Sequence, residues 1–305
     1  MKRILIATEK PFAPAAIKKM NKVFKKADFK VDLLEKYSSK RDLLDAVSKA
    51  DAAIIRSDKF ETEVLNAAKK LKIVVRAGAG YDNVDLATAT KNSVVVMNTP
   101  GQNANAVAEL AVGLAIFGIR ELFSGKPGGE LRNRTLGLHG FGFVARNVFR
   151  IARAMGMKVI VYTRYSKDAA AAIGLKVVHS LEELYKKSDV ISIHVPARDE
   201  HIKSVSADVL KHVKDGSIIV NTARKEVINE PDLVKMMEEK PNVKYMSDVT
   251  PDCAAEFAEK FEGRYFFTPK KAGAQTAEAN LNAGVAAAEQ IVDFFETGNI
   301  ACKVN

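Results

Sequence analysis

The segment Thr135–Ala145, TLGLHGFGFVA, decides the fold that we expect for this chain. A short apolar run leads into Gly140 and Gly142, which stand in the spacing G-x-G-x-x-A, and a helical pattern follows. Glycines in this spacing allow a tight turn and a close approach of the backbone to a pyrophosphate, and the helix start adds free amides and a positive dipole end. The segment therefore predicts a dinucleotide site, with Phe143 and Val144 in the first turn of the binding helix.

The place of this glycine loop in the chain predicts two domains. More than a hundred of the 305 residues precede it, and the chain is longer than one ordinary core requires. Apolar runs of strand length alternate with helical patterns throughout, which is typical of parallel sheets covered on both faces. Two long helical patterns, at 103–122 and 277–297, flank the middle block. We therefore expect an α/β protein with two Rossmann-like domains, in which a nucleotide-binding domain (99–275) is inserted into a discontinuous, flavodoxin-like substrate domain (1–98 and 276–305).

Composition narrows the class of protein. The net charge is +10, but the basic residues are mixed with acidic ones and no aromatic-plus-basic motif occurs, so we expect an anionic small-molecule substrate and no nucleic acid. No apolar stretch approaches the roughly 20 residues of a membrane span, and the first apolar run is too short for a signal peptide. Cys253 and Cys302 have neither metal-site nor disulfide spacing. These features predict a cytoplasmic protein without a membrane or metal partner.

Five further segments carry a resemblance to a known family. They read RAGAGYDNVD at 76–85, NTPG at 98–101, SIHVP at 192–196, VNTAR at 220–224 and SDV at 247–249. In this order and spacing the chain resembles the D-isomer-specific 2-hydroxyacid dehydrogenases. The resemblance implies an oxidoreductase that transfers a hydride between a nicotinamide cofactor, by default NAD, and a D-2-hydroxy acid. It also implies a homodimer.

Within that family, the chain is most similar to short-form members that oxidise D-3-phosphoglycerate to 3-phosphohydroxypyruvate, the entry to serine biosynthesis. Because the sequence ends at Asn305, we expect it to lack the C-terminal regulatory domain of longer members. Arg56 and Arg76 each close an apolar run and match arginines of the phosphoglycerate enzymes. Two guanidinium groups at one sheet edge suit a phosphate, which is the ground for expecting a phosphorylated substrate.

The matched segments supply the expected site residues. Gly78, Ala79 and Gly80 follow a strand and can bind a carboxylate through their backbone amides. Arg224 follows another strand and can hold the substrate carboxylate and polarise the reacting carbonyl. Asp248 is expected to accept a hydrogen bond from the nicotinamide carboxamide. The other expected cofactor contacts of these segments are Val195, Pro196, Thr222, Ala223 and Gly273.

The chain departs from the family at the acid–base pair. The family's Thr-Pro-His segment reads TPK here, so Lys270 stands in the place of the histidine, and Cys253, beside Asp252, stands in that of its glutamate partner. We expect Lys270 to act as the acid–base group, which requires desolvation and neighbouring positive charge to make it titrate near neutrality. Asp252 could orient it. The alternative is that Lys270 only binds an anion.

A second departure concerns the cofactor. An acidic residue about 20 positions beyond the glycine loop usually binds the ribose 2′-hydroxyl of NAD, whereas an arginine there accommodates the 2′-phosphate of NADP. The chain has Thr163 and Arg164 at this place. We therefore expect dual use or a preference for NADP.

Two other functions remain open at this stage. One is a glyoxylate or hydroxypyruvate reductase of the same fold. The other, of a different class, is a catalytically weak NAD(H)-sensing binding protein that resembles the corepressors of this architecture, an idea favoured by the missing histidine and glutamate.

Overall fold

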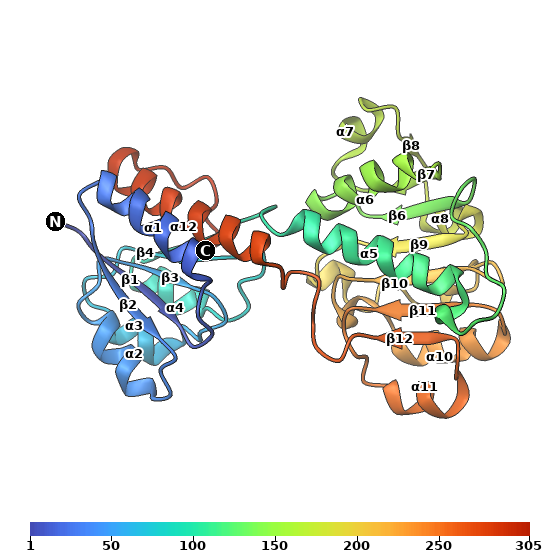
Figure 1. Ribbon diagram of the computed structural model, residues 1–305, viewed down its shortest axis with the longest axis horizontal. Helices are drawn as coiled ribbons and strands as arrows, with labels where there is room; N and C mark the ends of the chain where they lie inside the picture. Colours follow the sequence, from blue (N-terminus) through green and yellow to red (C-terminus); the bar gives the residue numbers. More distant parts are fainter. The chain divides into compact units, whose positions relative to one another are not determined.

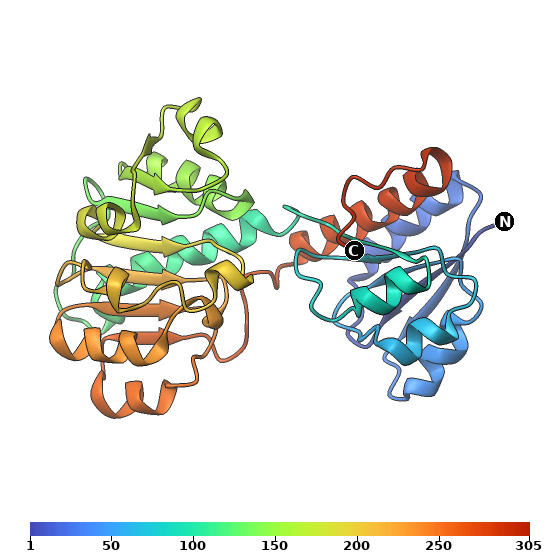
Figure 2. The same ribbon diagram turned by 180° about the vertical axis from the view of Figure 1, so that it is seen from behind.

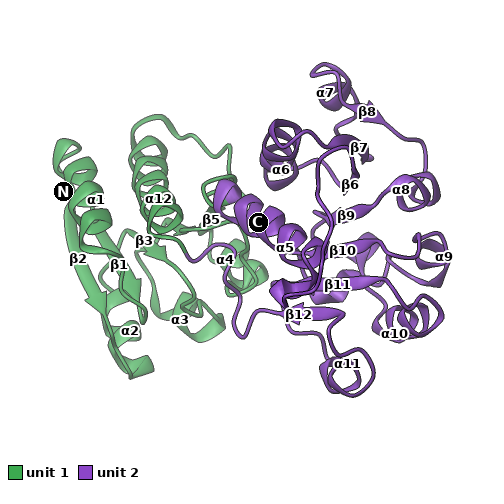
Figure 3. Cartoon of the chain, turned by 45° about the vertical axis from the view of Figure 1, so that its right-hand side comes forward, with its two compact units in different colours: residues 1–103, 276–305 green, residues 104–275 purple.

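The computed structural model describes residues 1–305, and they form two compact units. One unit contains residues 1–103 and 276–305, and the other contains residues 104–275 (Figure 3). Each unit is built on a parallel β-sheet with helices on both faces, so the expected fold class is confirmed. The structure contains no helix with the length and apolar content needed to cross a bilayer.

The sheet of the first unit has the strand order β2-β1-β3-β4-β5, which is the flavodoxin-like order. Alternate residues of β1 enter opposite cores, because successive side chains of a strand point to opposite faces. Helix α12, the last in the sequence, packs beside α1 on one face (Figures 1 and 2), and α2, α3 and α4 cover the other. The elements are β1 (Arg3–Thr8), α1 (Pro14–Lys26), β2 (Lys30–Glu35), α2 (Lys40–Val47), β3 (Ala52–Ile55), α3 (Thr62–Ala67), β4 (Ile73–Arg76), α4 (Leu86–Lys91), β5 (Val95–Asn98) and α12 (Ala277–Thr297).

The sheet of the second unit has the order β12-β11-β10-β9-β6-β7-β8, the doubly wound Rossmann order with one additional edge strand. Helices α5 and α6 contribute to the core on one face, and α8, α9, α10 and α11 to the core on the other. The strand order reverses between β6 and β9, which is where ligands of open α/β sheets bind. The elements are α5 (Ala104–Ile119), β6 (Thr135–His139), α6 (Phe143–Ala154), β7 (Lys158–Tyr162), α7 (Lys167–Ala171), β8 (Lys176–Val177), α8 (Leu181–Lys187), β9 (Val190–Ile193), α9 (Ala207–Leu210), β10 (Ile218–Asn221), α10 (Glu230–Glu239), β11 (Lys244–Ser247), α11 (Ala254–Lys260) and β12 (Tyr265–Phe267).

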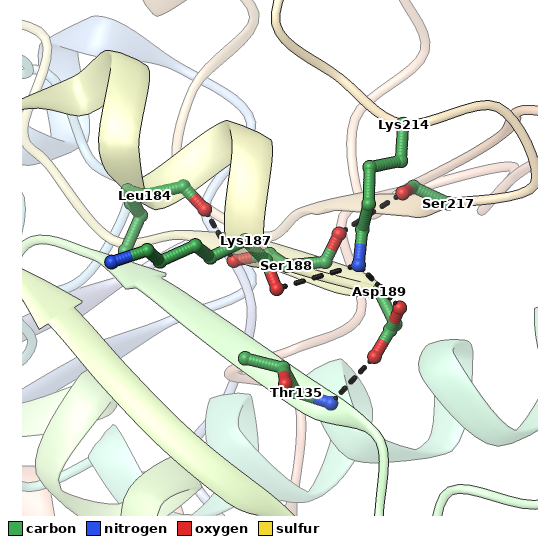
Figure 4. Close-up of polar contacts among 7 residues, drawn as sticks. All are labelled: Thr135, Leu184, Lys187, Ser188, Asp189, Lys214 and Ser217. Atoms are coloured by element: carbon green, nitrogen blue, oxygen red, sulfur yellow. Dashed lines mark hydrogen bonds and ion pairs between the residues drawn. The ribbon is translucent and has the colours of Figure 1, made fainter.

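Polar side chains close the amino edge of this second sheet (Figure 4). The Asp189 carboxylate accepts hydrogen bonds from the Thr135 amide at 2.7 Å and from Lys214 Nζ at 2.6 Å. The Ser217 hydroxyl donates to the Ser188 carbonyl at 3.1 Å. Since these groups satisfy one another, the amino edge is occupied by internal contacts, and the loops relevant to function follow the opposite, carboxyl ends of the strands.

Helix α5 ends earlier than the helical pattern at 103–122 predicts. It stops at Ile119, and residues 121–123 all have φ between 53° and 55°, in the left-handed region. The chain then turns back so closely that a Cβ at Gly128 would lie 2.6 Å from Arg120 Cα. Leu122 still packs against the core of this unit, which explains why the apolar pattern continues after the helix has ended.

The buried histidine at the end of β6 should make the protein sensitive to acid. His139 is 3% exposed, and burial, with positive charge from nearby histidines and Arg164, lowers its pKa to about 3. The unfolded chain therefore takes up a proton below about pH 6.5 that the folded chain does not, so stability falls as the pH falls. At pH 5 the loss from this one residue should be about 2 kcal/mol.

Between pH 7 and pH 5, we expect a His139→Gln variant to lose about 2 kcal/mol less of its free energy of unfolding than the wild type does. Urea unfolding at each pH, followed by circular dichroism, measures the difference from the wild type. An identical pH dependence in both proteins would contradict the assignment to His139.

Candidate active site

The glycine loop connects β6 to α6 and has the geometry of a pyrophosphate site. Gly140 has φ +100°, and a Cβ there would lie 2.8 Å from the His194 carbonyl oxygen, so only glycine fits. Gly142 is the N-cap of α6, no side chain caps the helix, and no atom lies within 4 Å of where its Cβ would be. Open space beside uncapped amides suits an anion. Phe143, the first helical residue, is 59% exposed, and Val144 follows it on the same turn.

Other expected cofactor residues lie at the carboxyl ends of neighbouring strands in the same unit. Thr163 is buried and Arg164 is exposed just after β7, while Val195 is buried and Pro196 is exposed after β9. The Thr222 hydroxyl after β10 is buried without a hydrogen-bond partner in the protein. A buried hydroxyl in this condition is costly unless a ligand or water satisfies it. The residues present therefore fit a dinucleotide, which the glycine loop and Thr222 would hold.

The loop that carries Arg224 is shaped by Asn221, the last residue of β10. The Asn221 side chain is buried, accepts a hydrogen bond from the Ala223 amide at 3.0 Å and donates one to the Arg224 carbonyl at 3.0 Å. The guanidinium of Arg224 is half-buried and donates to the Ala223 carbonyl at 3.0 Å. Asn221 was not among the expected site residues, although its position at a strand end beside an arginine was a usable signal.

The loop that carries Lys270 is held by Asp248. This carboxylate is completely buried and accepts hydrogen bonds from the Thr268 hydroxyl at 3.0 Å, the Ala272 amide at 2.7 Å and the Gly273 amide at 2.9 Å. These three hydrogen bonds give Asp248 an internal role that the sequence did not indicate, and its contact with the nicotinamide carboxamide stays a prediction. Lys270 itself is exposed.

The two loops touch each other. Lys271 Nζ donates to the Ala223 carbonyl at 3.3 Å, the same oxygen that Arg224 uses. Two cationic side chains, one from each loop, therefore converge on one carbonyl group. This arrangement places the segments of Arg224 and Lys270 side by side at the carboxyl edge of the sheet.

Asp252 and Cys253 have other partners. Asp252 is exposed and forms an ion pair with Lys225 at 2.5 Å, not with Lys270, so we no longer assign it an orienting role. The Cys253 amide donates to the Glu230 carboxylate at 2.9 Å. Burial, together with the charge of Glu230, raises the pKa of the Cys253 thiol to about 12. A thiol with such a pKa is a poor nucleophile, so packing is the better description of this residue.

In the first unit, Arg76 lies over the glycine-rich loop that follows β4. A Cβ at Gly78 would lie 1.6 Å from Arg76 Nη1, so the absence of a side chain makes room for the guanidinium. The loop is pinned by hydrogen bonds from Asn98 to the Ala79 carbonyl at 2.7 Å and from the Thr99 amide to the Gly78 carbonyl at 3.0 Å. The residues of this expected carboxylate site, including Gly80, are thus brought together with one arginine.

The guanidinium of Arg56, which we expect to bind a phosphate, makes contacts within the first unit. Its guanidinium donates to the carbonyls of Lys10 at 3.0 Å and Pro11 at 3.1 Å and to Asn280 Oδ1 at 2.6 Å, and it lies over the Phe12 ring. These contacts join the β1–α1 loop to α12. The buried Asp58, which sequence reasoning missed, accepts hydrogen bonds from the amides of Glu9 and Arg56 and from the Tyr37 hydroxyl. Arg56 therefore has a structural task in this unit that its sequence position did not indicate.

Comparison with known proteins identifies the family. The model of the D-isomer specific 2-hydroxyacid dehydrogenase NAD binding domain matches residues 120–261. A hydroxypyruvate reductase from Thermotoga maritima is 36% identical over 66% of this chain and 69% of its own length. The chain belongs to the D-isomer specific 2-hydroxyacid dehydrogenase family.

Three relatives carry a more particular name. A D-3-phosphoglycerate dehydrogenase from Archaeoglobus fulgidus is 33% identical over 95% of this chain. The chain spans about half the length of such curated relatives, 57% for this one and 51% for that of Methanocaldococcus jannaschii. The crystal structure of NAD⁺-bound 3-phosphoglycerate dehydrogenase from Entamoeba histolytica has a TM-score of 0.88 and 43% identity, and covers 100% of this chain and 98% of that one.

The two glycines of the loop should respond differently to alanine. Gly142→Ala meets no atom and keeps φ −82°, so stability should be unchanged while NAD binding weakens at least about tenfold. Gly140→Ala is strained and contacts His194, so unfolding should become easier by about 2 kcal/mol or more. Thermal melting and titration calorimetry measure the two effects. Equal loss of stability in both variants would contradict the distinction.

Proposed function

We propose that the protein oxidises a D-2-hydroxy acid, most specifically D-3-phosphoglycerate to 3-phosphohydroxypyruvate. When bound, the nicotinamide cofactor accepts the hydride in this direction and returns it in reverse. The observation that carries the proposal is the pair of adjoining loops that present Arg224 and Lys270 at the carboxyl edge of the sheet. The Arg224 guanidinium would hold the substrate carboxylate and polarise the C2–O bond, which needs a fixed positive charge near the reacting oxygen.

Lys270 is the group proposed to exchange the proton. Oxidation of the hydroxyl requires a base to take the O–H proton, and reduction of the keto group requires an acid to return it. The chain has no histidine after His212, and Cys253 and Asp252 are committed to other contacts. Lys270 is exposed on the loop next to Arg224, and its side chain forms no ion pair or hydrogen bond within the protein. Its neutral amine would accept the proton, and its ammonium form would give it back.

The first unit is proposed to bind the anionic part of the substrate. Arg76 Nη1 lies over Gly78, and the backbone amides of Ala79 and Gly80 donate to no backbone carbonyl. A guanidinium next to open amides is suited to a carboxylate or phosphate. The names of the relatives from Archaeoglobus fulgidus and Entamoeba histolytica support a phosphorylated substrate.

For the cofactor, we propose NAD with NADP as a second substrate. The family model is that of an NAD binding domain. The finer proposal of dual use is supported by Arg164, which is exposed after β7. An acidic residue at this place would repel the 2′-phosphate of NADP, whereas an arginine can accommodate it. Buried Thr163 brings no charge to this place.

A reductase acting on an unphosphorylated 2-keto acid is the second candidate. The hydrogen bonds of Arg56 to Lys10, Pro11 and Asn280 favour this candidate. Of the two arginines expected to bind a phosphate, only Arg76 then faces the loop proposed to bind the substrate. The relative from Thermotoga maritima is named a hydroxypyruvate reductase. The two candidates share the same proton and hydride chemistry and differ in the anion that is bound.

Initial rates with 3-phosphoglycerate, glycerate, lactate and glyoxylate, each with NAD(H) and NADP(H), test the proposal. We expect the highest kcat/KM for 3-phosphoglycerate and measurable activity with both cofactors. A higher value for glyoxylate than for the phosphorylated acid would support the reductase. Complete inactivity with tight NADH binding would instead support the sensing protein.

Replacement of Lys270 should abolish most turnover. General acid–base catalysis contributes about 10²–10⁴-fold, so Lys270→Ala should lower kcat by at least about a hundredfold. Lys235→Ala is the control, since it removes an exposed lysine of the same unit, on α10 and outside the two loops, and should leave kcat unchanged. If Lys270→Ala keeps more than about a tenth of wild-type turnover, Lys270 is not the acid–base group.

Substitution of Arg76 should change KM, whereas substitution of Arg56 should change stability. Arg76→Lys should raise KM for the substrate at least about tenfold, because a lysine cannot reproduce the fork of donors. It should lower stability by no more than about 1 kcal/mol, through loss of the hydrogen bond from Arg76 Nε to the Arg56 carbonyl. Arg56→Lys should lower stability by about 1–3 kcal/mol through lost hydrogen bonds and change KM little. Steady-state kinetics and thermal melting report the two quantities. An equal rise of KM in both variants would show that Arg56 also binds substrate.

A further inference from the structure

Asp248 is completely buried, and none of the groups that donate hydrogen bonds to it is cationic. Its charge is met by three donors, a hydroxyl and two backbone amides. All three lie between Thr268 and Gly273, on both sides of Lys270. Hydrogen bonds to an ionised acceptor are stronger than those between neutral groups, so one buried side chain fixes both ends of this short loop.

Close packing leaves this loop little freedom at its second end. A Cβ at Gly273 would lie 2.8 Å from Asp248 Oδ2 and 3.4 Å from a side-chain atom of Leu110 on α5. The absence of a side chain at Gly273 therefore allows its amide to approach the carboxylate. The same contact explains why glycine is needed at this position even though its φ is not positive.

A second buried polar side chain acts in parallel on the neighbouring strand. Asn221 ends β10, and its side chain closes the loop of Arg224 through hydrogen bonds to the Ala223 amide and the Arg224 carbonyl. The Asp248 amide donates to the Asn221 carbonyl at 3.0 Å, so the two loop-shaping residues are joined through the backbone. The separation of the two loops is thus set at their bases, by adjacent residues on adjacent strands.

We propose that Asp248 is a positioning residue that fixes the loop of Lys270 against the loop of Arg224. This inference rests on the proposed function, because it gives Lys270 the proton and Arg224 the carbonyl. A reacting group that is misplaced by about 1 Å can lose on the order of a hundredfold in rate, so a rigid carboxylate anchor matters for turnover.

Asp248→Asn is the substitution that tests this role. It preserves size but replaces one acceptor oxygen by an NH₂ group, which cannot accept from the Ala272 or Gly273 amide. We expect kcat to fall about 10- to 100-fold while the Kd for NADH changes less than about threefold. Thr268→Val, which removes a single donor to the same carboxylate, should give a smaller fall in kcat and protects the test against a variant that fails to fold.

A double-mutant cycle separates positioning from a general loss of structure. If Asp248 acts through Lys270, Asp248→Asn should lower kcat less than about threefold in a Lys270→Ala background. Asp189→Asn is the matched control. It makes the same change on a carboxylate of the same sheet, at the opposite edge, and should lower the melting temperature without lowering kcat.

Three results would overturn the inference. These are an equal fall of kcat in the Lys270→Ala background, a parallel weakening of NADH binding, or the same fall of kcat in Asp189→Asn. Hydrogen exchange of residues 268–273 provides a readout independent of activity and should accelerate in Asp248→Asn only. Unchanged exchange refutes positioning, whereas full turnover of Lys270→Ala refutes the proposed function, so the two failures are read from different measurements.

Discussion

The parallel register of β10 and β11 is the constraint on which the candidate site depends. Asn221 pairs with Ser247, so the two strands end level and the chain leaves both at the same edge of the sheet. Each exit is then shaped by a buried polar side chain, Asn221 for one loop and Asp248 for the other. Because the strands fix these two residues, the positions of the loops follow from backbone hydrogen bonds and do not depend on contacts between exposed side chains.

The same principle operates in the first unit with different chemistry. Arg76 ends β4, and the missing side chain at Gly78 lets its guanidinium lie over the loop that follows. Arg56, one strand away, has turned its guanidinium to the β1–α1 loop and α12. One arginine therefore faces the loop that we assign to the substrate, and the other holds together the parts of the unit that come from the two ends of the sequence.

The fold was predictable from the sequence because its signals are local. The glycine loop needs a particular backbone at Gly140, and apolar runs alternating with helices specify parallel sheets. The end of α5 was not, since residues 121–123 adopt a left-handed turn although none of them is a glycine or an asparagine. The contacts that Arg56 and Asp248 make within the protein were also not predictable. A sequence gives the donors and acceptors at a strand end, but whether they face a ligand or a neighbouring loop depends on contacts made far along the chain.

The pH dependence of kcat/KM for Lys270→His, compared with the wild type, tests the central claim most directly. A lysine and a histidine lose their protons in different pH ranges, so the limb that reports the catalytic base in the oxidative direction must move with the residue that carries the proton. We predict that this limb shifts to lower pH in the histidine variant while activity is retained. A limb at the same pH in both proteins would show that another group carries the proton and would contradict the account.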